Sequence, residues 1–383
     1  MSHLFRDIAL LGTLASLGYC AVAIWAALRF AHSRDTPIPL PPELPPVSIL
    51  KPLKGTDPQM YEALRSHCLQ NYPQYEILFG ISDPNDPAIG VVEKLRLEFP
   101  DRAIEFVLCD KVLGANGKVS SLAQLAAVAK HDYLLVNDSD VRVEPEYLRT
   151  VVAELLQADV GLVTCLYRGV PSATIPSKLE SLGIGTDFSA GVLVARQIEG
   201  GLQFGLGSTL ALRKSALEAI GGFEAIADHL ADDYELGRLI SAKNLKVTLS
   251  RSVVDSFLPA YDASEFLSHQ LRWARTIRAS RTAGYAGLVL PFTLPWALLT
   301  LMLAHGADWS LGLFVIAVLM RLAVAGCVGG LVLKDRTLLR SMWLLLIRDL
   351  LAVVIWIGGL AGRTILWRGQ RFYLRKGKLQ RIT

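Results

Sequence analysis

The stretch from Ile8 to Phe30 is predominantly apolar, carries Arg29 as its single charged residue, and is long enough to cross a membrane. A transmembrane helix needs about 20 such residues to span the hydrocarbon core of a bilayer. A signal peptide is the alternative, but its apolar stretch usually has about 7–15 residues and ends at a small-residue cleavage site, which is not obvious here. The sequence therefore predicts an uncleaved N-terminal anchor.

A second apolar region lies near the other end of the chain and divides into three segments, residues 287–304, 310–333 and 342–366. The first contains two prolines and could re-enter the membrane without crossing it. The last holds Arg348 and Asp349, so it could begin as an interfacial helix. Both possibilities stay open, because three crossings would carry the basic C-terminus to the far side of the membrane.

The hydrophobic share of the 383-residue chain is 52%, but this apolar content is concentrated at the two ends. The middle of the chain has an ordinary globular composition. The sequence therefore predicts four parts: an anchor at 1–34, a globular domain at 35–282, membrane helices at 283–367 and a basic cytoplasmic tail at 368–383.

The net charge is only +4 and the middle domain contains no basic block, which argues against a nucleic-acid partner. Basic residues gather at the membrane borders instead, at Arg29 and Arg34 and in an acid-free C-terminus. The positive-inside rule then predicts a cytoplasmic middle domain. The five cysteines have no metal or redox spacing, which fits a reducing compartment.

Short apolar runs alternate with helical patterns between residues 47 and 136. Such alternation predicts an α/β fold in which a parallel sheet is connected by crossover helices. Ligands of open sheets of this kind bind beyond the carboxyl ends of the strands. Several carboxylates fall at predicted strand ends: Asp83, Asp86, Asp138 and Asp140.

Asp138 and Asp140 directly follow the apolar run Tyr133–Val136. Two carboxylates at this spacing can hold Mg²⁺ or Mn²⁺, and such a metal ion can grip a diphosphate. The alternative is a solvated loop before a helix that starts near Pro145. The strand-end position favours the metal site.

Two further stretches carry candidate site residues. Asp232 and Asp233 open a predicted helix, either as an ordinary acidic first turn or with Asp233 as a general base. His269, Arg272 and Trp273 share one face of a later helix. That face could rest on lipid headgroups, or Arg272 could bind a phosphate while Trp273 packs against a sugar or acceptor.

Taken together, several stretches resemble the ceramide glucosyltransferase family of inverting, membrane-bound glycosyltransferases. They are "VSILKPLKG", "SDPNDPAI", "GKVSSL", "NDSDVRV", "GLVTCLYRG", "GSTLALRKSALEAIGGF", "ADDYELGRLI", "HQLRW" and "LWRGQRFYLR". The resemblance covers nearly the whole chain after the first anchor. It implies a GT-A-type, Rossmann-like glycosyltransferase domain, a UDP-sugar donor, a membrane-lipid acceptor and a divalent metal.

The resemblance also implies roles for individual residues. Asp86, or alternatively Asp83, would hold the uracil end of the donor. Asp138 and Asp140 would hold ribose, metal and diphosphate, with Lys118 steadying the phosphates. Asp233 would be the catalytic base. The remaining signature would bind donor and acceptor through His269, Arg272 and Trp273, although the family usually has Gln or Arg where this chain has His269.

In length and layout the chain resembles bacterial hopanoid-associated members, which implies a multi-pass protein of the bacterial inner membrane that transfers N-acetylglucosamine to a hopanoid polyol. Glucose transfer to ceramide is the alternative. The apolar, Gly-rich segment 175–208 is the predicted acceptor region, or else a core segment. A processive polysaccharide synthase would need more spanning segments, and a non-catalytic lipid carrier would leave the strand-end aspartates unexplained.

Overall fold

The computed structural model describes residues 2–34, 38–39, 41–367 and 370–382. The chain forms two compact units, each assembled from three separate stretches. The helical unit contains Met1–Thr36, Arg168–Ile198 and Ala260–Arg371, and the sheet unit contains Pro37–Tyr167, Glu199–Pro259 and Phe372–Thr383. The sequence divides the chain differently, into an anchor, a globular domain, membrane helices and a tail. These four functional parts stay a prediction.

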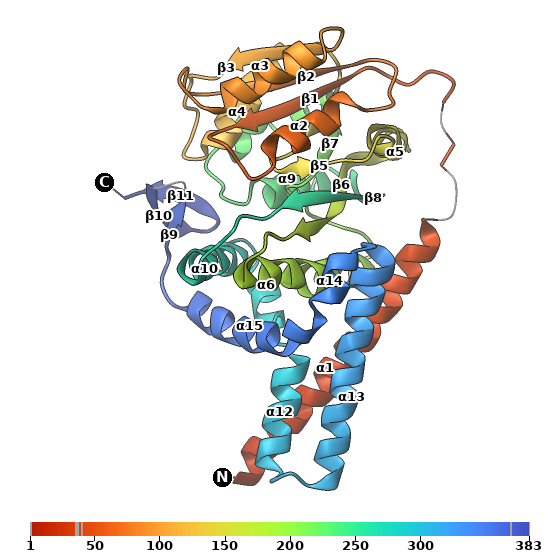
Figure 1. The fold of residues 1–383 in the computed structure, drawn as a ribbon, viewed down its shortest axis with the longest axis vertical. Coiled ribbons are helices and arrows are strands. Elements are labelled where there is room, and N and C mark those ends of the chain that lie inside the picture. Colours follow the sequence, from red (N-terminus) through yellow and green to blue (C-terminus); the bar gives the residue numbers. More distant parts are fainter. Residues whose placement is uncertain (1, 35–37, 40, 368–369, 383) are drawn as a thin grey trace. The chain divides into compact units, whose positions relative to one another are not determined.

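The sheet unit is built on a mixed sheet with the strand order β3-β2-β1-β4-β7-β6-β8-β5 (Figure 1). The strands are β1 (Val47–Leu53), β2 (Tyr75–Ile81), β3 (Ala103–Leu108), β4 (Tyr133–Val136), β5 (Val141–Arg142), β6 (Val160–Val170), β7 (Leu210–Arg213) and β8 (Lys246–Phe257).

The first four strands are parallel, as the sequence predicts. β1 pairs with β2 in the register Val47↔Tyr75 and with β4 in the register Val47↔Tyr133. The chain crosses between them through α2 (Met60–Cys68), α3 (Ala88–Glu98) and α4 (Gly117–Val128). All seven residues of β1 and of β2 are buried, as expected for central parallel strands that are covered on both faces.

The other half of the sheet is antiparallel, which the strand–helix alternation does not predict. β7 runs antiparallel to β4 and to β6, and β5 runs antiparallel to β8. Only Asn137–Asp140 separate β4 from β5, and a parallel crossover needs a dozen or more residues. The chain therefore leaves β4 in a tight turn and joins the opposite edge of the sheet.

The remaining elements of the sheet unit surround this framework. The helices are α5 (Tyr147–Leu155), α8 (Lys214–Ala219), the 3₁₀ helix η2 (Phe223–Ile226) and α9 (Asp232–Ser241). The C-terminal residues form a hairpin of β10 (Gln370–Arg375) and β11 (Lys378–Arg381). The predicted basic tail is thus largely β-structure, except for residues 368, 369 and 383, which lie outside the described residues.

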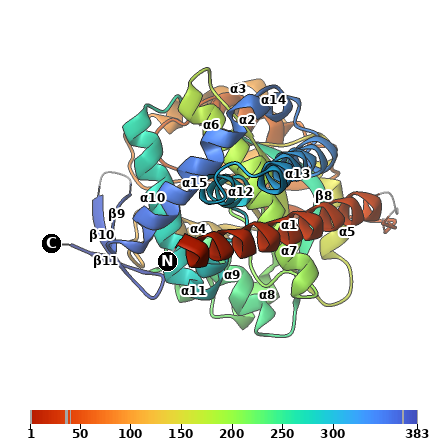
Figure 2. The ribbon, with the colours of Figure 1, turned by 90° about the horizontal axis from the view of Figure 1, so that it is seen from below.

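The helical unit consists mainly of helices, several of them long (Figures 1 and 2). Its elements are α1 (Ser2–Ser33), α6 (Ile175–Gly183), the π-helix η1 (Ile184–Phe188), α7 (Ser189–Ile198), α10 (Ala263–Ser280), α11 (Thr282–Gly287), α12 (Thr293–Leu303), α13 (Asp308–Val324), the π-helix η3 (Ala325–Val332), α14 (Arg336–Arg340), the 3₁₀ helix η4 (Met342–Leu344), α15 (Leu345–Leu360) and strand β9 (Thr364–Trp367).

Three helical stretches of the described chain are long and apolar enough to cross a membrane: His3–Ser33, Asp308–Val332 and Met342–Leu360. The first agrees with the predicted anchor. The proline-containing segment forms only the 11-residue α12, which at about 1.5 Å per residue is too short to cross alone. It packs beside α1, where Gly12 leaves room for the Trp296 ring.

Four charged side chains are packed among these helices. Arg321 on α13 donates from Nε and Nη2 to the carboxylate of Asp349 on α15, over 2.9 and 2.8 Å. The same guanidinium binds Asp187 of η1, which also lies 3.3 Å from Arg348 Nη2. Arg321 and Asp349 are each only 3% exposed. Two cations therefore face two anions in this ion cluster.

Candidate active site

The turn after β4 is anchored by a buried asparagine. Asn137 Nδ2 donates to the carbonyl of Ser208 over 2.7 Å and to the Tyr147 hydroxyl over 2.9 Å, while its Oδ1 lies 3.1 Å from His67 Nε2. These contacts hold the chain at the point where the strand ends. The next side chain, Asp138, is 40% exposed at the carboxyl end of the parallel strands.

Lys118 joins the strand-end aspartate to the start of α9. Its Nζ lies 2.8 Å from Asp138 Oδ1 and 3.2 Å from Asp232 Oδ2. Lys118 sits in the first turn of α4, which is capped by the Asn116 side chain. Burial opposes the charged form of the ammonium, but Asp138 and Asp232 outweigh it and raise the pKa of Lys118.

Asp233 lies beside this ion-paired group. Its Oδ1 accepts a hydrogen bond from the backbone N–H of Tyr234 over 2.8 Å. Burial, followed by the negative charge of Asp232, raises the pKa of Asp233 to about 6, while Lys118 opposes the shift. The pKa of Asp233 therefore lies close to neutral pH, where a carboxylate can exchange protons with a substrate.

Gly207 lies close to the carboxylates of both Asp138 and Asp233. A Cβ atom at this residue would lie 3.3 Å from Asp233 Oδ2 and 3.4 Å from Asp138 Oδ2. The segment reaches this position because Gly237 of α9 allows the backbone at Phe204 and Gly205 to approach closely. The absence of a side chain at Gly207 therefore lets its backbone lie close to both acids.

Asp140 completes the acidic turn. Its Oδ2 accepts a hydrogen bond from the Ser256 hydroxyl on β8. Burial, followed by the charge of Asp138, raises the pKa of Asp140 to about 6. Within the described ranges, no three His, Cys, Asp or Glu side chains form a ready metal cluster. The two carboxylates of the turn, Asp138 and Asp140, nevertheless suit a cation whose other ligands are phosphate and water oxygens.

Asp83 and Asp86 follow β2, as expected, but their carboxylates already have backbone partners. Asp86 accepts hydrogen bonds from the N–H of Gly55 over 2.9 and 3.0 Å and from the N–H of Ala88 over 2.9 Å. It therefore ties the loop after β1 to the start of α3. Asp83 is exposed and accepts from Asn85 N over 2.9 Å.

Lys51 is a site residue that the sequence analysis missed. It lies in β1, is 0% exposed, and its Nζ donates to the carbonyl of Asp138 over 3.0 Å. Burial lowers the pKa of Lys51 to about 7, against the attraction of Asp138 and Asp140. A lysine inside the otherwise apolar run "VSILKPL" was the available signal, since a buried lysine needs a partner.

The other signature residues belong to the helical unit. His269 on α10 lies 3.2 Å through Nδ1 from the Glu180 carboxylate, and its ring centroid is 5.2 Å from that of Trp273. Trp273 also contacts Phe188, with ring centroids 6.3 Å apart. His269 and Trp273 are therefore brought together on one face of α10, as the spacing predicts. Arg272 lies between them in the sequence, and its role stays a prediction.

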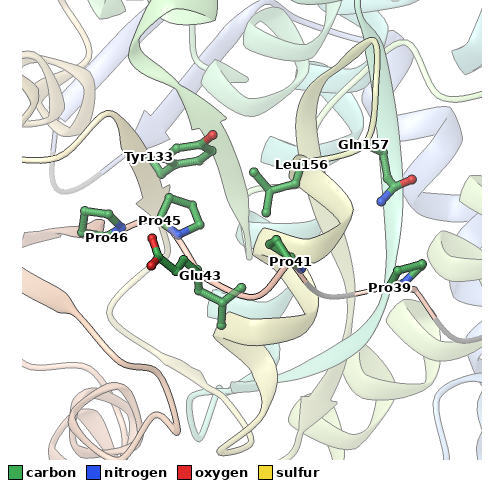
Figure 3. A pocket seen from close by; sticks show the side chains of 9 residues that line it. Pro39, Pro41, Glu43, Pro45, Pro46, Tyr133, Leu156 and Gln157 are labelled. Carbon is green, nitrogen blue, oxygen red and sulfur yellow. The ribbon is translucent and has the colours of Figure 1, made fainter.

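The sheet unit also contains a hollow of about 700 Å³. Its lining residues include Pro41, Pro45 and Pro46 of the proline-rich segment, together with Tyr133, Leu156 and Gln157 (Figure 3). Tyr133 is the first residue of β4, whereas Asp138 follows the last. The hollow therefore adjoins the amino end of the strand and not the carboxyl end where the acids gather.

Comparison with known proteins assigns the chain to a family. The sequence profile of Glycosyl transferase family 21 matches residues 8–380. Ceramide glucosyltransferase 3 of Caenorhabditis elegans is 24% identical over 350 residues, which are 87% of this chain and 74% of that protein. Ceramide glucosyltransferase of Komagataella phaffii is 34% identical over 141 residues, 34% of this chain and 28% of that protein.

Some of these matches cover only part of the relatives. Ceramide glucosyltransferase 1 of Caenorhabditis elegans is 25% identical over 230 residues, and the match spans 48% of its length. A mannosyltransferase from Pyrobaculum calidifontis, solved with GDP-Man and Mn²⁺, has a similar fold, with a TM-score of 0.55 and 18% identity over 93% of this chain and 99% of that chain. The chain belongs to Glycosyl transferase family 21 and is a glycosyltransferase with a GT-A-type α/β fold and apolar helices.

Proposed function

We propose that the chain transfers a sugar from a UDP-sugar to the hydroxyl of a membrane lipid, with inversion at the anomeric carbon. The observation that carries this proposal is the group at the carboxyl end of β4, in which Lys118 binds both Asp138 and Asp232 while Gly207 lies close to Asp138 and Asp233. It offers a place for a diphosphate and a carboxylate able to take a proton.

The reaction is a single displacement. The lipid oxygen forms a bond to the anomeric carbon as the bond from that carbon to the diphosphate breaks. Asp233 accepts the hydroxyl proton, because its pKa of about 6 leaves the carboxylate mostly ionised at neutral pH. Asp232 keeps that carboxylate basic through repulsion, and Lys118 holds Asp232 and Asp138 in place.

The donor would be held by both ends. Asp86 or Asp83 would face the uracil, Lys118 and Arg272 would contact phosphate oxygens, and Trp273 would pack against the sugar. If Asp86 binds the uracil, the uracil competes with the backbone N–H groups of Gly55 and Ala88 for the Asp86 carboxylate. Asp83 is exposed and accepts a hydrogen bond from Asn85, so more of its carboxylate is available to a ligand.

A divalent cation, Mg²⁺ or Mn²⁺, would be held by Asp138 and Asp140 and would stabilise the negative charge of the departing diphosphate. The excess of carboxylates over cations in this turn supports its binding. A structurally similar mannosyltransferase was solved with GDP-Man and Mn²⁺, which is consistent with a divalent metal and does not distinguish between the two.

Ceramide-type lipids are the acceptors that the relatives support. The reported relatives are ceramide glucosyltransferases, so glucose from UDP-glucose is the matching donor. N-acetylglucosamine transfer to a hopanoid polyol, which the chain layout favours, has no support from these relatives. The acceptor would meet residues of segment 175–208, His269 and Trp273, of which Phe188 already contacts Trp273.

The test uses full-length protein in lipid nanodiscs with each pairing of UDP-glucose or UDP-N-acetylglucosamine with ceramide or a hopanoid polyol. We expect glycolipid from UDP-glucose and ceramide, with the anomeric configuration inverted in the product. Product only from the hopanoid pairing would restore that alternative. Lipid binding with neither transfer nor UDP-sugar binding would identify a non-catalytic carrier and overturn the proposal.

We also infer a membrane protein whose sheet unit faces the cytoplasm, based on the basic residues at both membrane borders. A cysteine introduced at the exposed Glu62 should react with an impermeant maleimide only in inside-out vesicles. Labelling in intact spheroplasts would place the sheet unit outside.

A further inference from the structure

The C-terminal hairpin of β10 and β11 contributes no side chain to the proposed mechanism, although it is well formed. Arg375 pairs with Lys378, and the two residues between them, Lys376 and Gly377, have φ values of 50° and 78°. Two positive φ values in a two-residue loop are typical of a tight hairpin turn whose twist matches its strands. Phe372, Leu374 and Leu379 of the strands and Gly377 of the turn are buried, while the basic side chains are exposed.

The outward backbone groups of this hairpin bind a segment that is distant in sequence. Pairs in an antiparallel ladder alternate between hydrogen-bonded and non-hydrogen-bonded. Since Arg375↔Lys378 flanks the turn, Leu374↔Leu379 is the non-bonded pair, and the Leu379 N–H points away from β10. It donates to the carbonyl of Asp228 over 2.7 Å, and Leu230 N donates to the Gly377 carbonyl over 3.2 Å.

The same short segment is held from a second direction by the loop that begins α4. Asn116 N donates to the Ala227 carbonyl and Asn116 Nδ2 to the His229 carbonyl, each over 2.8 Å, and Ala115 N donates to Asp228 Oδ1 over 2.9 Å. Gly114 permits this approach, because a Cβ there would lie 2.5 Å from the Ala227 carbonyl oxygen. The segment Ala227–Leu230 is thus held by two sets of hydrogen bonds, one from the hairpin and one from the loop before α4.

This segment leads directly into the acidic pair. Leu230 is followed by Ala231, and α9 begins at Asp232 and Asp233. The loop on the other side leads into Lys118, which binds Asp232. The position of Asp233 relative to Asp138 therefore depends on how well Ala227–Leu230 is held.

The geometry points to the β10–β11 hairpin as a positioning element for the catalytic base, an inference that rests on the proposed function. Its turn and the Leu379 N–H hold Asp228 and Leu230 so that α9 presents Asp233 to the incoming hydroxyl. A misplacement of about 1 Å can cost about 10²-fold in rate without preventing substrate binding. The exposed basic side chains of the hairpin are free of this task, since the backbone N–H of Leu379 and the carbonyl of Gly377 perform it.

The test compares Leu379→Pro with Leu379→Ala. Proline removes the N–H that binds Asp228, and this N–H makes no bond inside the hairpin, whereas alanine shortens the side chain and keeps the N–H. Gln380→Ala on the exposed face is the control. We expect Leu379→Pro to lower kcat by about tenfold to 10²-fold, with the Kd for UDP and the KM for UDP-sugar within about threefold of wild type. Leu379→Ala should retain most of the turnover.

Several outcomes would overturn the inference. They are full turnover in Leu379→Pro, an equal loss in Leu379→Ala, or a parallel loss of kcat and UDP affinity that indicates general unfolding. Hydrogen exchange on the unaltered enzyme gives a second measurement: the Leu379 and Leu230 amides should be protected, and exchange as fast as in an open loop would contradict the inference. Asp233→Asn separates the two hypotheses, because if that variant stays active the proposed base is wrong whatever the hairpin does.

Discussion

Two groups of ionised side chains in this protein differ in one respect, the balance of charge. In the sheet unit, Asp138, Asp140, Asp232 and Asp233 face the cations Lys51 and Lys118. In the ion cluster of the helical unit, Arg321 and Arg348 face Asp187 and Asp349. The first group has surplus negative charge beside Gly207, whereas the second is balanced, and its residues Arg321, Arg348 and Asp349 are buried.

The difference teaches what each group can do. Carboxylates in excess repel one another and raise one another's pKa, so they gain from a metal ion or from a proton. The acidic turn is therefore suited to binding and proton transfer. A balanced group inside apolar helices has no surplus charge to offer a ligand, and its ion pairs join α13, α15 and η1.

Removal of divalent metal should produce the largest effect, because only the sheet-unit group has charge left to bind a cation. We expect EDTA to abolish measurable transfer and Mg²⁺ or Mn²⁺ to restore it. Thermal unfolding of the helical unit should hardly change, since its ion cluster needs no metal. Full transfer in the chelator would mean that the surplus carboxylates bind no metal.

Asp233→Asn should produce the next largest effect. The substitution keeps the size of the side chain and removes its basicity, and general-base assistance is worth about 10²–10⁴-fold in rate. Turnover should fall by that factor while UDP affinity stays nearly unchanged. Asp232→Asn is the matched control. If that variant loses turnover while Asp233→Asn keeps it, the catalytic base is Asp232 and not Asp233.

Arg321→Met tests the balanced ion cluster. Removing one partner leaves buried carboxylates uncompensated, which typically costs about 3–5 kcal/mol of stability. The double variant Arg321→Met/Asp349→Leu restores balance and should recover most of that loss. Thermal unfolding of the solubilised protein gives the measurement. Equal stability of the single variant and the wild type would show that the cluster does not hold the helices together.

The pH dependence of kcat gives the smallest effect. Because burial and Asp232 raise the pKa of Asp233 to about 6, its protonated form persists to higher pH than in an ordinary aspartate. Turnover should therefore be lost as pH falls through about 6, near tenfold for each further pH unit. Asp232→Asn removes the repulsion and should move this limb to lower pH. A limb that does not move would show that Asp232 has no influence on the base.

Much of the fold was predictable because it depends on local patterns. The alternation of residues 47–136 predicted β1–β4 and their crossover helices, and the apolar stretch at Ile8–Phe30 predicted α1. The strand-end position of Asp138 and the helix-start position of Asp233 followed from the same patterns. The close approach of these two carboxylates at Gly207 did not follow, because strand order in the antiparallel half is set by pairing between distant segments.

By itself, the sequence determined which residues form the parallel half of the sheet, which segments are apolar enough for a membrane, and which acids follow strands or open helices. Only the tertiary structure decided that Lys51 supports the Asp138 turn, that Arg321 is balanced by Asp349 and Asp187, and that the C-terminal turn at Gly377 binds Leu230. The physical reason is range. Periodicity reports each residue's immediate neighbours, whereas these contacts join segments far apart in the chain, and their formation depends on the packing of the whole unit.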